Sequence, residues 1–189
     1  MLAVAGVLAW QGSNFIAARF PDRPRPRDLL FETLPHIDML KYAADVAIVA
    51  SILLLLVYAL RRARRDIPGM VAVFAIFYAL RAAIMVLTPL ALAHGDGAYY
   101  SFLPITQNGN FPSGHAGAAL LCFLLVDARD SPVLRRVQLA LAALEWVALI
   151  VSRSHYTVDV IGGLLLAYFV WREWSDGTLF APLKRLLAE

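Results

Sequence analysis

The sequence predicts an all-α, polytopic membrane protein in which residues 1–189 form a single domain, a bundle of six transmembrane helices. Of the residues, 60% are hydrophobic and only 16% are charged. The mean hydropathy is +0.66, so ordinary polar side chains cannot cover the surface. Six apolar runs approach the roughly 20 residues that a spanning helix needs. We expect these helices at residues 1–20, 39–60, 69–93, 113–127, 134–152 and 157–174.

The first run is a weak candidate for a spanning helix, because it contains Gln11, Ser13 and Asn14. We therefore expect this helix to be tilted, partly interfacial or packed inside the bundle. Residues 21–38 follow, with four prolines and alternating charges. Proline disrupts a long regular helix, so this segment is predicted to be a surface loop.

The second run ends in the densest basic cluster of the chain, Arg61-Arg62-Ala63-Arg64-Arg65. Short basic loops favour the cytoplasmic side of a membrane. If six helices span, the segments at 110–115 and 152–163 then both lie at the extracytoplasmic face. We therefore expect a cell-membrane protein whose histidine-containing segments face outward.

Two ionisable residues fall within the predicted helices. Arg81 in the third helix would cost about 2.5 kcal/mol or more at membrane depth, unless it faces the bundle interior or a wet cavity. We interpret it as functional in preference to a side chain that reaches an interface. Glu145 in the fifth helix has no surrounding motif, and a functional role and a structural hydrogen bond between helices remain equally open.

The candidate catalytic residues lie in two polar segments that precede apolar runs. The first is Asn-Phe-Pro-Ser-Gly-His, ending at His115, and the second contains His155 and Asp159. Residues four apart share a helix face, so the Asp159 carboxylate can accept a hydrogen bond from one ring nitrogen of His155. The other nitrogen is then available as a base or nucleophile. His115 would supply a second proton-transfer group.

The neighbours of these histidines suggest a phosphate substrate. Arg153, the Ser113 hydroxyl and the backbone N–H groups around Gly114 form an anion-binding set. The sequence has no acidic cluster for magnesium, no Gly-x-x-x-x-Gly-Lys loop and no His-Glu-x-x-His motif, so we expect no metal and no cofactor. The small net charge of +3 gives no indication of a nucleic-acid partner. Metal-free phosphoryl transfer through a phosphohistidine is the predicted chemistry.

The two segments resemble a known family. Phe-Pro-Ser-Gly-His-Ala and Ser-Arg-Ser-His-Tyr-Thr-Val-Asp-Val are similar to the second and third motifs of the type-2 phosphatidic acid phosphatase superfamily. The form His-Tyr-Thr-x-Asp-Val resembles the sphingomyelin synthase branch, as does Tyr78-x-x-Arg81 followed by Thr88. One departure from the phosphatase branch is that only Ser154 separates Arg153 from His155, where that branch has five residues.

The resemblance implies six transmembrane helices and specific roles for three residues. His155 would attack phosphorus, Asp159 would orient it, and His115 would protonate the leaving group. His115 would then act as the base when the group passes to water or a lipid alcohol. Arg81, Tyr78, Ser113, Gly114 and Arg153 are expected to bind the substrate.

Our leading hypothesis is a phospholipase C-like enzyme or lipid phosphotransferase. It would take a phospholipid head group and pass it to ceramide, diacylglycerol or water, so its partners are a phospholipid, a lipid alcohol acceptor and the bilayer. The alternative is a phosphatase acting on phosphatidic acid or an isoprenyl diphosphate. An intramembrane serine protease using Ser113 and a non-catalytic membrane scaffold are minor alternatives. The loop at 94–110 carries no motif, and we expect it to select the head group.

Overall fold

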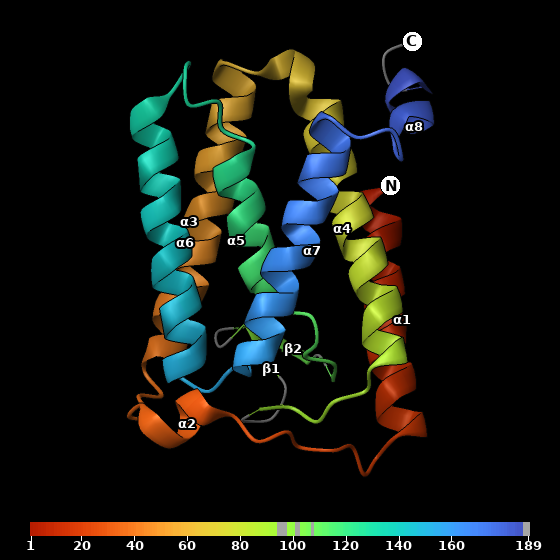
Figure 1. The fold of residues 1–189 in the computed structure, drawn as a ribbon, viewed down its shortest axis with the longest axis vertical. Coiled ribbons are helices and arrows are strands. Elements are labelled where there is room, and N and C mark those ends of the chain that lie inside the picture. The colour runs from red at the N-terminus through yellow and green to blue at the C-terminus, as the bar shows by residue number, and fades with distance from the viewer. Residues whose placement is uncertain (94–97, 101–102, 107, 187–189) are drawn as a thin grey trace.

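The computed structural model describes residues 1–93, 98–100, 103–106 and 108–186, and it is predominantly helical (Figure 1). The longer helices coincide closely with the six predicted apolar runs. They are α1 (Leu2–Arg19), α3 (Leu40–Arg61), α4 (Ile67–Leu87), α5 (Gly114–Leu124), α6 (Pro132–Val151) and α7 (Thr157–Ser175). Shorter elements are α2 (Leu29–Thr33), the 3₁₀ helix η1 (Arg64–Asp66) and α8 (Ala181–Leu186).

The six helices form, but the prediction that all six span a membrane is not confirmed. Within the described residues, two stretches are long and apolar enough to cross a bilayer, Leu40–Arg61 and Arg64–Leu87. Helix α5 is apolar but has only 11 residues, about half the length that a straight span requires. Charged residues at the ends of the other helices shorten their apolar stretches.

Three local predictions differ from the structure. The segment at 21–38 contains a short helix, α2, which begins because the Asp28 side chain accepts a hydrogen bond from the Leu30 N–H at 2.9 Å. Helix α4 ends at Leu87, six residues before the predicted end, because Pro89 disfavours helical backbone in the residue before it. The expected all-α fold also includes a hairpin of β1 (Ala98–Tyr100) and β2 (Leu103–Thr106). Residues 94–97, 101–102 and 107 of the 94–110 loop lie outside the described part.

Helix α5 occupies the centre of the bundle. It packs against α6 and α7, while α1 packs on α4 and α3 packs on α6 (Figure 1). Small residues make this central position possible, since α5 begins Gly-His-Ala-Gly-Ala-Ala and all six of these residues are buried. His115 therefore begins a helix that is surrounded by others. Both histidine segments lie at one end of the bundle, and the basic cluster at 61–65 lies at the other (Figure 1).

The interface between α3 and α6 contains buried polar side chains. Gln138 donates a hydrogen bond to the Ser51 carbonyl oxygen at 2.9 Å. Glu145 lies one heptad further along α6, is fully buried, and has no hydrogen bond from any described residue to either carboxylate oxygen. One interpretation of Glu145 is a structural hydrogen bond between helices. Among the described residues, the structure shows no such hydrogen bond.

Glycines allow α5 and α7 to approach at the end that carries the histidines. A Cβ atom on Gly117 would lie 2.8 Å from the Gly163 carbonyl oxygen, and one on Gly163 would overlap the Ser113 carbonyl oxygen. The Ser113 N–H also donates to the Asp159 carbonyl oxygen at 2.8 Å. This backbone contact fixes the start of α5 relative to the start of α7.

We expect Gly163→Ala to lower the stability of the fold by about 3 kcal/mol, because the added methyl group meets backbone that cannot rotate away. Gly6→Ala is the matched control, since a Cβ on Gly6 meets no atom within 4 Å. In helix α1 that change should be neutral or slightly stabilising. Thermal unfolding of both purified variants in detergent measures the difference. Equal unfolding temperatures would contradict the tight α5–α7 contact.

Candidate active site

His155 and Asp159 form the paired arrangement that their spacing predicts. The Nδ1 atom of His155 lies 3.3 Å from Oδ2 of Asp159, and the two residues are 7% and 0% exposed. The same Oδ2 accepts a hydrogen bond from the Tyr156 N–H at 3.0 Å. Because Nδ1 of His155 faces the carboxylate, the other ring nitrogen, Nε2, points away from Asp159. Nε2 makes no hydrogen bond to a described residue. A histidine held in this way can act as a nucleophile.

The second histidine lies across from this pair. The ring centroids of His115 and His155 are 6.2 Å apart, and the planes are inclined by 57°. His115 is 8% exposed, in the first turn of α5. The ring of His115 comes from the first turn of α5, and the ring of His155 comes from the segment just before α7.

Arg81 reaches this site from α4. Its Nε atom donates to the Pro112 carbonyl oxygen at 2.8 Å and its Nη2 to the Gly109 carbonyl oxygen at 3.4 Å. A Cβ on Gly114 would lie 3.0 Å from Nε, so the guanidinium packs directly against the start of α5. Arg81 also lies within electrostatic range of His115. Arg81 is 2% exposed and so lies in the bundle interior, one of the two placements that lower the cost of an arginine at membrane depth.

The Arg153 side chain, which is predicted to bind phosphate, makes its contacts with α2. The Arg153 backbone lies in the left-handed region, with φ of 57°, at the turn that ends α6. The Arg153 N–H bonds to the Ile150 carbonyl and the Ser154 N–H to the Leu149 carbonyl, both at 3.0 Å, which is the Schellman pattern. The side chain donates to the Phe31 carbonyl oxygen at 2.8 Å and lies over the Phe31 ring. In this structure Arg153 therefore connects the end of α6 to α2.

Asp28 is a residue at the site that sequence reasoning did not identify. Its carboxylate accepts from the Thr157 N–H at 2.5 Å and the Thr157 hydroxyl at 2.9 Å, in addition to its bond from Leu30. It thus caps two helices, α2 and α7, which begin about 130 residues apart in the chain. The stacked rings of Phe31 and Tyr156, 5.5 Å apart, reinforce the contact. An aspartate before a short apolar run is an N-cap signal, so the sequence could have indicated α2. The same signal gives no indication that the Asp28 carboxylate also accepts hydrogen bonds from Thr157.

We expect Asp28→Asn to slow turnover roughly 10-fold and to reduce stability by about 2 kcal/mol. Asparagine keeps one oxygen acceptor but places an NH₂ group against one of the donors. The residues adjoining His155 would then lose a fixed contact with α2. Asp22→Asn is the matched control, an exposed aspartate in the same loop. Turnover and thermal unfolding of both variants should be compared, and equal values would show that the contact does not position the histidine.

Two further predicted binding residues, Ser113 and Tyr78, make contacts within the bundle. Ser113 is fully buried, and its Oγ accepts a hydrogen bond from the Ala116 N–H at 3.2 Å, so it caps α5. Tyr78 packs edge-on against Phe77 at 5.1 Å and borders two apolar clusters in the bundle. The structure therefore brings His115, His155, Asp159, Arg81 and Gly114 together. It gives Ser113 a role in holding the start of α5.

The site contains the parts that a two-step transfer requires. It has an oriented imidazole, a second imidazole on the facing helix and a buried guanidinium. Burial raises the pKa of the neighbouring Tyr156, so its phenol stays protonated near neutral pH. Within the described ranges, no group of three or more His, Cys, Asp or Glu side chains is arranged to hold a metal ion.

The comparison with known families matches most of the chain. A family model described as the PAP2 superfamily matches residues 28–172. That range begins at Asp28 and includes Arg81 and both histidine segments. No curated protein and no solved structure matches the chain significantly.

Proposed function

The chain belongs to the PAP2 superfamily, the type-2 phosphatidic acid phosphatases and their relatives, and on that premise we propose that it transfers the phosphorylated head group of a membrane phospholipid. Membership indicates phosphatase or phosphotransferase activity, and the superfamily is typically membrane-associated. The observation that carries the proposal is the His155–Asp159 pair, with His115 facing it at 6.2 Å. It supports transfer through a covalent histidine adduct.

The first half-reaction forms a nitrogen–phosphorus bond. Nε2 of His155 attacks phosphorus, and the bond from phosphorus to the diacylglycerol oxygen breaks. His115 donates its proton to that oxygen, so diacylglycerol leaves neutral. Asp159 stabilises the positive charge that develops on the His155 ring. Arg81, held against the start of α5, adds positive charge beside the phosphate oxygens.

The second half-reaction reverses these roles. His115, now neutral, takes a proton from the hydroxyl of ceramide, diacylglycerol or water. The resulting oxygen attacks phosphorus and the nitrogen–phosphorus bond breaks, which restores free His155. The choice of acceptor decides whether the enzyme acts as a transferase or as a phospholipase C-like hydrolase.

The set of Tyr78, Arg81, Thr88 and His-Tyr-Thr-Val-Asp supports the transferase form of the proposal. A second candidate function is a phosphatase acting on phosphatidic acid or an isoprenyl diphosphate. The observation that favours it is Pro112 before Ser113-Gly114-His115, a phosphatase-like form of the second motif. For both functions we propose a multi-pass protein whose site faces outward, since the basic cluster lies at the opposite end of the bundle.

The test uses the purified full chain in sealed vesicles, with substrate supplied only to the outer leaflet. Phosphatidylcholine, phosphatidylethanolamine and phosphatidylinositol carry a labelled head group, with and without ceramide. A parallel reaction contains phosphatidic acid without an acceptor. Mass spectrometry of the trapped His155 adduct distinguishes the two functions, because an adduct that keeps the head group indicates head-group transfer and an adduct of bare phosphate indicates a phosphatase. Absence of release from every lipid would refute both.

A further inference from the structure

A cavity of about 550 Å³ lies at the end of the bundle opposite His115 and His155. It is open to the surface, and its lining residues come from α3, η1, the start of α4, the end of α5 and the loop after it, α6, α7 and α8. None of its lining residues belongs to the candidate active site. The activity proposed above gives this cavity no role.

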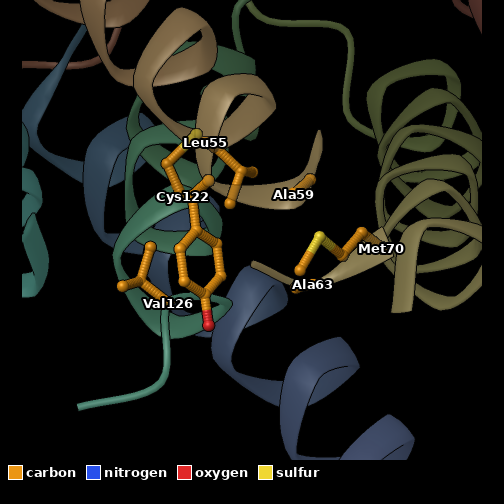
Figure 2. Packing of buried hydrophobic residues seen from close by; sticks show 7 residues of the cluster. Leu55, Ala59, Ala63, Met70, Cys122 and Val126 are labelled. Atoms are coloured by element: carbon orange, nitrogen blue, oxygen red, sulfur yellow. The ribbon is translucent and has the colours of Figure 1, made fainter. Parts of the chain in front are cut away.

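The floor of the cavity is apolar. Tyr58 and Met70 line it, and both belong to a buried cluster with Leu55, Ala59, Ala63, Cys122 and Val126. Figure 2 shows this cluster packed between α3, α4 and α5. Leu124 and Leu125 continue the apolar surface. Such a floor suits hydrocarbon better than a fully hydrated ligand.

The rim carries three cations, Arg65, Arg135 and Lys184. Arg135 is held in place because it donates to the Val126 carbonyl oxygen at 2.7 Å and lies 4.5 Å from the centroid of the Phe123 ring. This bond uses one of the five N–H donors of a guanidinium. Lys184 donates to the Trp174 carbonyl oxygen at 2.7 Å, so α8 is tied to the end of α7.

The charge and the aromatic residues at the rim indicate one class of ligand. Two carboxylates, Asp66 and Asp127, also line the cavity, so the three cations leave a net positive charge. Trp171 and Trp174 complete the rim, and indoles favour the boundary between water and hydrocarbon. A cationic rim above an apolar floor fits a phosphate that is attached to an acyl chain.

We propose that this cavity binds the phosphate head group of an anionic phospholipid, at a site separate from the catalytic histidines. The phosphate contacts Arg65, Arg135 and Lys184, and its lipid chain lies along the surface of Leu124, Leu125 and Met70. Of the basic cluster at 61–65, Arg65 is the arginine that lines the cavity. This binding is independent of the proposed catalytic function.

The test is native mass spectrometry of the full chain in detergent, titrated with phosphatidylglycerol and, separately, with phosphatidylcholine. The wild type should retain phosphatidylglycerol in preference. Arg65→Gln with Lys184→Gln should weaken that binding roughly 30-fold, since each basic residue contributes about a factor of five. Arg65→Gln alone should weaken it about 5-fold, and this exposed residue has no described hydrogen bond whose loss could unfold the protein.

The matched control removes the same charge outside the cavity. Arg62→Gln with Arg172→Gln changes two exposed arginines at the same end of the bundle, which pair with Asp130 and Asp176. Its phosphatidylglycerol affinity should stay within about 2-fold of the wild type. Equal losses in the two double variants would indicate general surface attraction and overturn the site. Displacement of the lipid by millimolar inorganic phosphate would indicate a site for a soluble anion and overturn the lipid assignment.

Discussion

His155→Ala is expected to abolish turnover, and Asp159→Asn to reduce it on the order of 10⁴-fold, with every lipid substrate. Alanine removes the atom that forms the bond to phosphorus. Asparagine removes the charge that faces Nδ1 of His155 at 3.3 Å, and its amide group can present a donor where the ring also needs to donate. The tautomer of the His155 ring with its proton on Nδ1 would then no longer be favoured. The ring would also lose the carboxylate that stabilises its positive charge. Head-group release from labelled phospholipid measures both effects.

Stability must be measured alongside activity, because Asp159 also caps α7. Its Oδ2 accepts from the Tyr156 N–H, so Asp159→Asn should cost about 1 kcal/mol of folding free energy. That loss leaves most molecules folded and cannot explain a 10⁴-fold effect. His36→Ala is the control for His155→Ala, since His36 is an exposed histidine at the same end of the bundle. Wild-type turnover by either active-site variant would remove His155 from the proposed mechanism.

The helices and the contact between His155 and Asp159 were predictable because both depend on short-range pattern. Apolar runs located the six longer helices, and the four-residue spacing of His155 and Asp159 predicted their contact. The end of α4 was misplaced because the apolar run continues past Pro89, where the helix cannot. The hairpin β1–β2 lies in a loop whose sequence carries no motif.

The roles of Arg153 and Asp28 were not predictable, because they depend on contacts across more than 100 residues. Nothing near Arg153 indicates that Phe31 will supply its hydrogen-bond acceptor. Similarly, Asp28 lies among alternating charges that are typical of a solvated loop, yet its carboxylate caps the helix that carries Asp159. In both cases the partner comes from folding α2 against the 152–157 segment. The sequence therefore predicts the contact between His155 and Asp159 better than the contacts that hold the neighbouring segments in place.

The remaining prediction concerns the proton carried by His115. His115→Ala should reduce kcat/KM by about 10²- to 10³-fold when the leaving group is a lipid alcohol, because an alkoxide leaves slowly without a proton. A phosphodiester with a nitrophenyl leaving group needs no such proton, so its kcat/KM should change by less than about 5-fold. His155→Ala is the comparison variant, since it should remove activity on both substrates. Steady-state rates measured for the two substrates test this difference.

The second half-reaction gives a separate expectation for the same variant. His115 also removes the proton from the acceptor, so His115→Ala should hydrolyse its histidine adduct slowly whatever the leaving group. With the nitrophenyl substrate we therefore expect a rapid burst of about one nitrophenol per enzyme, followed by slow turnover. Stopped-flow absorbance measures the burst, and mass spectrometry should find the adduct on His155. An equal loss of kcat/KM with both leaving groups, or the absence of a burst, would mean that the facing ring 6.2 Å from His155 does not transfer the proton.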